Sequence, residues 1–192
     1  NMSKPATVTS GAAFPDEATL VEQARSGDMA ALSRLVSRYQ DRIVNTCYRL
    51  CGNVDDAQEL AQDAFLQATR HIGGLEQRAH FYTWLFRIAV NLSLSHRRKR
   101  GRAPRLTIHA GEAEDLAMHD HDGWSGRRSE DAMEPAARLS ARETHTRVMA
   151  ELEQLEDDYR TVVVLRDIEG FDYQQIADIL EVAVGTVKSR LH

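Results

Sequence analysis

Apolar residues recur every three or four positions along most of the chain, which is the spacing of helices with one buried face. The longest such stretch begins after Asp28, a residue type that favours the N-cap of a helix, and ends at Gly52-Asn53. Its apolar positions are Leu32, Leu35, Val36, Tyr39, Ile43, Cys47, Leu50 and Cys51. The pattern predicts a long amphipathic helix.

Three shorter patterns complete the first hundred residues. A short helix capped by Asp16 and ending near Gly27 is expected to bury Leu20, Val21 and Ala24. A helix starting near Asp55 is expected to bury Ala57, Leu60, Ala61, Ala64, Phe65, Ala68 and Ile72, and to expose Gln58, Glu59, Gln62 and Asp63. A helix starting at Phe81 is expected to bury Trp84, Leu85, Ile88 and Leu92. Helices that share a core predict one compact domain over residues 16–100.

The C-terminal part predicts a second helical domain over residues 135–192. Pro135 suits the first turn of a helix, whose buried positions are expected at Leu139, Val148, Met149, Leu152 and Leu155. A second helix spans Tyr159 to Ile168 and stops at Glu169-Gly170. A helix capped by Asp172 and another that opens near Gly185 follow, with the spacing of a helix-turn-helix.

The remaining segments lack helical periodicity. Residues 1–15 are mostly small or polar and predict a disordered tail. Residues 101–134 are rich in Gly, His, Asp, Arg and Ser, and predict a flexible linker that is longer than a compact domain normally contains. The expected fold class is therefore all-α, with two small helical domains joined by this linker.

Charge is distributed unevenly along the chain, whose formal net charge is −5. Residues 81–105 carry seven Lys or Arg and no acidic residue, whereas residues 112–122 carry five acidic residues and no Lys or Arg. Because screening limits the reach of each charge, an acidic total is compatible with a basic binding face. The helix from Phe81 joins aromatic residues, which can stack on bases, to cations, which can neutralise phosphates. It is predicted to bind opened DNA.

Several classes of function are not indicated. No stretch has the length and apolarity of a membrane span, no signal peptide is recognisable, and two cysteines are too few for a disulfide framework, so a cytoplasmic protein without membrane contact is expected. No phosphate loop, activated nucleophile or metal-ligand spacing is found, so neither enzyme activity nor a cofactor is expected. Cys47 and Cys51 are interpreted as core thiols rather than redox or metal groups. The segment from His119 to Asp122 is interpreted as acidic linker, although these side chains can in principle ligate a metal.

Four segments in this order resemble one known family. They are Asp55–Phe65, Phe81–Asn91, Tyr173–Ala177 and Val184–Leu191. With a polar linker between the second and the third, they are similar to the extracytoplasmic-function (ECF) sigma factors, the smallest class of promoter-specificity subunits of bacterial RNA polymerase. The resemblance implies a sigma region 2 bundle in the first domain and a sigma region 4 helix-turn-helix in the second.

The resemblance implies that the Asp55 helix binds the clamp helices of the polymerase's largest subunit. The matching residues are Asp56, Glu59, Gln62, Asp63 and Phe65. Without the resemblance, their polar face would be interpreted as solvated surface. Region 4 is implied to bind the flap of the second-largest subunit.

The Phe81 helix matches the part of the family that melts and reads the −10 element of the promoter. Asn91 matches the position that pairs with a flipped base, and an amide offers both a donor and an acceptor for a base edge. Tyr82 is a further candidate, whereas Trp84 is in phase with Ile88 and is assigned to the core. Phosphate contacts are expected from Arg97, Arg98, Lys99 and Arg100.

In the helix-turn-helix, the resemblance implies contacts with the −35 element. The matching residues are Tyr173, Gln174, Thr186, Lys188, Ser189, Arg190 and His192. Glu181 stands where many such turns have Gly, so a positive φ there would cost ~1 kcal/mol. Family members continue with a basic segment past the position of His192, so −35 affinity of this chain is expected to be reduced.

The family is usually held inactive by an anti-sigma factor, which is therefore an expected partner beside the polymerase and promoter DNA. Two alternatives from other classes remain open at this point. One is a stand-alone helix-turn-helix regulator that binds duplex operators without polymerase. The other is an adaptor whose helices bind only protein.

Overall fold

A computed structural model describes residues 16–75, 80–102 and 135–192, and these residues are helical or in connecting turns, with no strand among them. The helices of the N-terminal bundle are α1 (Glu17–Arg25), α2 (Met29–Cys51), α3 (Val54–His71) and α4 (Phe81–Arg102), with a 3₁₀ turn at Ile72–Gly74. The C-terminal unit contains α7 (Pro135–Gln154), α8 (Asp157–Val163), a π-helical turn (Val164–Ile168), α9 (Tyr173–Leu180) and α10 (Val184–Leu191). The all-α fold class is confirmed.

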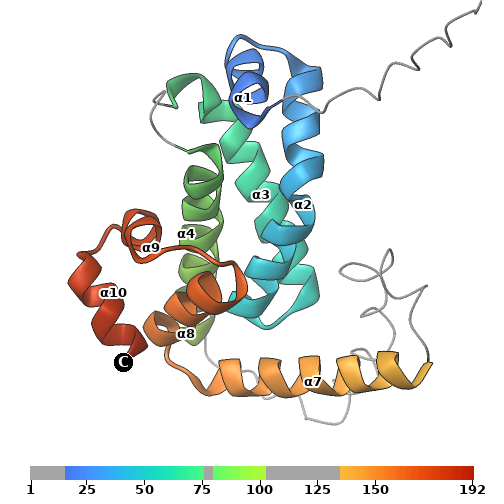
Figure 1. Ribbon diagram of the computed structural model, residues 1–192, viewed down its shortest axis with the longest axis vertical. Helices are drawn as coiled ribbons and strands as arrows, with labels where there is room; N and C mark the ends of the chain where they lie inside the picture. The colour runs from blue at the N-terminus through green and yellow to red at the C-terminus, as the bar shows by residue number, and fades with distance from the viewer. Residues whose placement is uncertain (1–15, 76–79, 103–134) are drawn as a thin grey trace, which may run out of the picture.

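The N-terminal bundle places α2, α3 and α4 side by side, with α1 packed on α2 (Figure 1). The expected caps of α2 are present, because the Asp28 carboxylate accepts bonds from the N–H groups of Ala30 and Ala31, and Gly52 ends the helix at φ 78°. Asn53 caps α3 in the same way. Asp16 stands at the start of α1 without a side-chain cap bond, so its predicted capping is wrong.

Alanine residues on α3 let the helices approach closely. Their side chains are buried with no more than 2% exposure, and they are Ala57, Ala61, Ala64 and Ala68. Against them lie the buried positions of α2, such as Leu35, Ile43 and Leu50. Small side chains at a helix contact shorten the distance between helix axes, so α3 packs firmly while its polar face remains outside.

The buried face of α4 differs from the expected one. Of the predicted set only Leu85 is fully buried, whereas Trp84, Ile88 and Leu92 are half-buried. The other fully buried positions are Phe81, Phe86, Ala89, Val90 and Ser93. This helix packs on α2 and α3 on one side and on α9 on another, so its apolar surface is wider than a single stripe.

In the C-terminal unit, α9 and α10 form the expected helix-turn-helix. The Asp172 carboxylate accepts a bond from the Gln175 N–H (2.8 Å), and the Gln175 side chain accepts one from the Asp172 N–H (2.9 Å), which is a capping box. On α7, Met149 and Leu152 are buried as predicted. Val148 and Leu155 are 43% and 37% exposed, so their predicted burial is wrong; they line a shallow groove with Val163.

The two units pack against each other, which the sequence did not predict. In Figure 1, α7 crosses below the ends of α2–α4, and α8 and α9 lie beside α4. Arg160, which is 1% exposed, joins them: it donates to the carbonyl groups of Leu152, Glu153 and Leu155 at the end of α7, and to Leu50 O at the end of α2. Terminal carbonyl groups have no partner within their own helix, so a buried cation satisfies several at once.

Other predicted segments fall outside this description. The predicted tail (1–15) and nearly all of the predicted linker (101–134) lie outside the described residues, as does the loop at 76–79. The helix α4 continues to Arg102, slightly past the predicted start of the linker. Among the described helices, none combines the length and apolarity required to cross a membrane.

Glu181 adopts the left-handed conformation (φ 55°, ψ 42°) and is the non-glycine residue with positive φ in the described part of the chain. The free energy of unfolding of the Glu181→Gly variant is expected to be about 1 kcal/mol higher than that of the Glu181→Ala variant, because only glycine avoids the Cβ clash of this conformation. Urea denaturation of both variants measures the difference. Both lose the Arg87 ion pair equally, so equal stabilities would contradict the assignment of strain to this residue.

Candidate nucleic-acid and protein interfaces

The polar face of α3 is exposed over most of its length. Glu59, Gln62 and Asp63 share this face, and they are joined by Leu66, which is 46% exposed. The sequence interpretation missed Leu66, although its spacing of three and four from Asp63 and Gln62 indicates the same side of the helix. Phe65 is half-buried and packs on the core. An acidic face with one apolar side chain is suited to binding protein.

Asp56, assigned to the same face, is turned toward α4 instead. Its carboxylate forms an ion pair with Arg100, and Nε2 of His96 lies 3.2 Å from Oδ2. Asp56 is on the first turn of α3, which lies next to the end of α4. It therefore contacts the cationic end of α4 (residues 96–100) directly. The structure thus joins one residue predicted to bind polymerase to one predicted to bind DNA.

The four consecutive cations at residues 97–100 of α4 do not all have the same surroundings. Arg98 and Lys99 are exposed. Arg97 points inward: its Nε donates to Oδ1 of Asp157 (2.7 Å) and its Nη1 to Leu50 O (3.1 Å). Arg100 is exposed, but its guanidinium forms an ion pair with Asp56 of α3. Two of the four predicted phosphate-binding cations are therefore paired within the chain.

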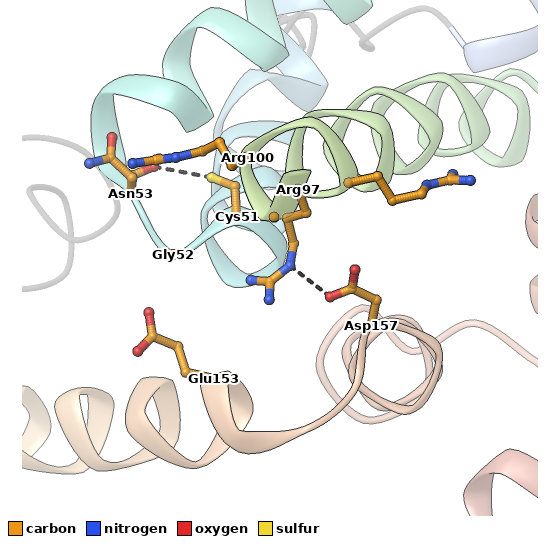
Figure 2. A pocket seen from close by; sticks show the side chains of 9 residues that line it. Cys51, Gly52, Asn53, Arg97, Arg100, Glu153 and Asp157 are labelled. Atoms are coloured by element: carbon orange, nitrogen blue, oxygen red, sulfur yellow. Dashed lines mark hydrogen bonds and ion pairs between the residues drawn. The ribbon is translucent and has the colours of Figure 1, made fainter. Parts of the chain in front are cut away.

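A hollow of about 660 Å³ lies at this junction (Figure 2). One wall is α4, and the turn at Cys51, Gly52 and Asn53 and the C-terminal unit complete it. Its charged lining residues are Arg97, Arg98, Arg100, Glu153 and Asp157. Figure 2 shows Arg97 pointing toward Asp157 across the hollow. Guanidinium groups on one wall and carboxylates on the other make it a site where an anion would compete with the protein's own acidic residues.

The aromatic start of α4 is partly covered. Tyr82 stacks on Phe171 with ring centroids 4.6 Å apart at 17°, and the guanidinium of Arg42 lies 4.7 Å above its ring. Burial raises the pKa of Tyr82 above its ordinary value, and its hydroxyl is buried without a hydrogen-bond partner. Trp84 packs against Phe81 at 5.9 Å. Asn91, by contrast, is exposed farther along the helix.

The outer face of the helix-turn-helix is largely exposed with respect to the described part of the chain. Lys188, Ser189 and His192 are exposed and Thr186 is half-buried. Arg190 forms an ion pair with Asp158 of α8, which directs it toward the protein. At the start of α9, Gln174 is exposed, whereas Tyr173 lies under the guanidinium of Arg166 at 4.9 Å. The exposed set is small, polar and basic, as required for a helix that enters a DNA groove.

The contact that the sequence interpretation missed centres on Glu169. Its side chain is 5% exposed and is surrounded by Arg42, Thr46 and Arg49 of α2. From the sequence, Glu169 is interpreted as a polar residue that ends a helix together with Gly170. No local pattern distinguishes a stop residue from a buried partner, because Arg42 and Thr46 lie 127 and 123 residues earlier.

Comparison with known proteins identifies the family. Residues 35–103 match the family model described as Sigma-70 region 2, and residues 145–192 match Sigma-70, region 4. The ECF RNA polymerase sigma factor SigW of Bacillus subtilis is 35% identical over 90% of this chain and 89% of that protein. The RNA polymerase sigma-H factor of Pseudomonas aeruginosa is 35% identical (90% and 86%), and the ECF sigma-E factor of Escherichia coli K12 is 33% identical (90% and 86%).

Two solved structures share the fold. CnrH, in complex with the cytosolic domain of CnrY, has a TM-score of 0.63 at 23% identity, covering 91% of this chain and 89% of that chain. The sigma factor RpoE of Bartonella quintana, in complex with the anti-sigma factor NepR, has a TM-score of 0.57 at 23% identity, covering 83% and 88%. The fold is that of a two-domain, all-α helix-turn-helix protein. The chain belongs to the ECF RNA polymerase sigma factor family, as the four sequence segments indicated.

The two cysteines lie in the bundle as expected for core thiols. Cys47 is fully buried, and this burial raises its pKa to about 12. Burial also raises the pKa of Cys51, whose thiol donates to Asn53 O at 3.2 Å. Within the described ranges, no group of three or more His, Cys, Asp or Glu is arranged to hold a metal ion, and His119–Asp122 lie outside those ranges.

These thiols are expected to resist alkylation. At pH 8 a thiol with a raised pKa stays protonated, and the thiolate is the reactive form. Iodoacetamide should leave Cys47 unmodified in the folded protein and should modify it rapidly in guanidinium chloride, and it should modify Cys51 more slowly in the folded protein than in the unfolded chain. Mass spectrometry of timed samples measures both. Rapid modification of Cys47 in the folded protein would instead indicate a reactive site.

Proposed function

We propose that this sigma factor binds core RNA polymerase, directs it to particular promoters and helps to open the duplex there. The observation that carries the proposal is that this chain, a member of the family, exposes both an acidic face on α3 and a polar, basic face on α10. A helix-turn-helix regulator acting alone would use only α10, and a protein-binding adaptor would use only α3. The chain is proposed to act as a transcription initiation factor in the cytoplasm, and not as an enzyme.

The proposed polymerase contact uses the outer face of α3. Glu59, Gln62 and Asp63 would contact the clamp helices of the largest subunit. Phe65 would position the helix by packing on the core. Asp56 would contribute once its ion pair with Arg100 is broken. The position of Leu66 beside the three polar residues supports this, because an exposed apolar side chain gives a protein interface a desolvated centre. The C-terminal unit would meet the flap of the second-largest subunit.

The proposed −10 contact uses α4. Asn91 would pair with the edge of a flipped base through its amide, and Tyr82, at the other end of the same helix, would be a further contact. Extruding a base costs a few kcal/mol, which recognition of the base and of the single strand must return. Arg97, Arg98, Lys99 and Arg100 would contact phosphates, which adds affinity without sequence choice. The exposure of Asn91, Arg98 and Lys99 supports this assignment.

The proposed −35 contact uses the helix-turn-helix. The residues that would face the major groove or its phosphates are Thr186, Lys188, Ser189, Arg190 and His192, with Tyr173 and Gln174 near the backbone. We further propose the domain limits of 16–100 and 135–192 around a linker, with a tail at 1–15. Control by an anti-sigma factor is proposed from the relatives, since the RpoE structure contains one.

Run-off transcription tests the function directly. The chain, mixed with core polymerase and genomic fragments from its source, should produce discrete transcripts. The double variant Glu59→Arg, Asp63→Arg should lose at least about tenfold in polymerase affinity, because like charges facing each other cost several kcal/mol. Gel filtration with core polymerase measures this. Glu22→Arg, on exposed α1, is the control and should still co-elute. A chain that never co-elutes and starts no transcript would exclude a sigma factor.

The salt dependence of DNA binding tests the phosphate contacts. Removing two cations with Arg98→Gln, Lys99→Gln should lower the slope of log K against log salt by about 1.4 to 1.8, at about 0.7 to 0.9 per phosphate contact. Fluorescence anisotropy at several salt concentrations gives the slope. Arg34→Gln, Arg38→Gln removes the same charge from exposed α2 and should change the slope little. Equal slopes in both variants would contradict a localised contact.

A further inference from the structure

The hollow of Figure 2 contains a carboxylate that the protein leaves unpaired. Among the described residues, the side chain of Glu153 has no hydrogen bond or ion pair, although it lines the same hollow as three arginines of α4. We propose that the hollow binds a guanine nucleotide with two or more phosphates, whose base is read by Glu153 and whose phosphates are held by these arginines. They are Arg97, Arg98 and Arg100. Such binding requires neither polymerase nor DNA, so it stands apart from the proposed function.

The end of α7 and the turn after α2 fix the position of Glu153. Its backbone carbonyl accepts a bond from Nη2 of the buried Arg160 (2.8 Å), which anchors the last turn of α7. Its Oε1 lies against the turn, because a Cβ atom at position 52 would be only 2.6 Å from it. Gly52 therefore leaves room for the carboxylate. Figure 2 shows this carboxylate directed from α7 toward the turn at Gly52.

The unpaired carboxylate selects a particular kind of base. A carboxylate is an acceptor only, and its two oxygens can accept two parallel N–H bonds. The Watson–Crick edge of guanine has two neighbouring donors, N1–H and the amino group at C2, whereas the edges of adenine, cytosine and uracil place an acceptor beside a donor. An acceptor facing Glu153 would be repelled. Guanine is therefore the base whose edge matches this group.

The arginine wall keeps donors for phosphate. Arg97 uses Nε and Nη1 for Asp157 and Leu50, so its Nη2 has no hydrogen-bond partner in the described part of the chain. Arg100 uses only Nη1, for Asp56. Guanidinium groups bind phosphate oxygens through pairs of N–H donors. These two arginines can therefore take phosphate oxygens without giving up their contacts with the protein.

Arg98 is the least engaged of the three cations. Its Nε donates to the carbonyl group of Leu94 in its own helix (3.2 Å), and both terminal nitrogens have no partner among the described residues. The side chain is exposed. Arg98 is therefore the arginine that a phosphate can reach at the lowest cost in existing contacts.

The size and polarity of the hollow favour a nucleotide over a simple anion. Its volume of about 660 Å³ lies within the range of about 300 to 1,000 Å³ that is usual for small-molecule sites. An inorganic anion would pair with the arginines but would leave Glu153 facing a further negative charge. A guanine nucleotide instead directs its N–H donors to Glu153 and its phosphates to α4. Its two ends thus match the two walls.

The same arginines are proposed above to contact promoter phosphates. If they do, a nucleotide in the hollow and DNA would compete for them. The ligand would also contact both α4 and α7, and would thereby stabilise the packing of the two units. DNA binding by the chain would in that case respond to the concentration of guanine nucleotides.

The test is binding of GDP, ADP and inorganic pyrophosphate to the full chain, measured by isothermal titration calorimetry. The unaltered chain should bind GDP at least about tenfold more tightly than ADP, which is the discrimination expected of one bidentate contact with a base edge. Glu153→Gln should remove this preference without weakening pyrophosphate binding. Arg98→Gln should weaken all three ligands about tenfold, as expected for loss of a charge-assisted hydrogen bond.

Glu151→Gln and Arg147→Gln are the matched controls, because these residues line a separate groove, and neither should change the three affinities. Circular dichroism shows whether each variant is folded, and Arg100→Gln replaces Arg98→Gln if the latter unfolds. Equal affinity for GDP and ADP, or no binding of GDP at millimolar concentration, overturns the proposal. A preference for GDP that survives Glu153→Gln also overturns it. Transcription with core polymerase does not depend on these measurements, so the proposed function would stand if they fail.

Discussion

The end of α2 is the point on which the arrangement of the two halves depends. Leu50 O accepts bonds from Nη1 of Arg97 on α4 and from Nη1 of Arg160 on α8. Two cations on one acceptor repel each other, and Asp157 offsets this because it lies 2.7 Å from Arg97 and 3.6 Å from Arg160. A helix end that would otherwise need water is thus satisfied by side chains from both halves. Separation of the halves exposes all of these groups to solvent at once.

The character of the contact suits reversible association. It combines one aromatic cluster with carboxylate–guanidinium pairs, whereas permanent interfaces are more apolar. Aromatic stacking gives the contact between the two units a defined geometry, and the charged groups can be hydrated when the units separate. The same cations and rings are chemically suited to nucleic acid.

The sequence predicts local features well and contacts between distant segments poorly. Asp28, Gly52 and Asp172 mark helix ends correctly, because a cap depends on neighbours within four residues. The positive φ of Glu181 occurs at the position where many helix-turn-helix turns have Gly.

Burial was predicted less well where two units meet. Phe86 is buried because Phe171 covers it, and no period along α4 contains that information. Val148 on α7 and Leu155 just after it follow the helical period, yet both line an open groove beside Val163. Among site residues, exposure of Glu59, Gln62 and Asp63 agrees with the helical period. The pairing of Asp56 with Arg100 required the packing of α3 on α4.

The π-helical turn at Val164–Ile168 makes the direction of the following residues sensitive to the length of this segment. Such a turn accommodates one more residue than an α-helical turn, and each residue rotates a helix by about 100°. Deletion of a single codon within Val164–Ile168 would swing the residues that follow away from α2 and α4 while leaving every interface side chain unmutated. The packing of the C-terminal unit on α2 and α4 therefore depends on the length of this segment as well as on its side chains.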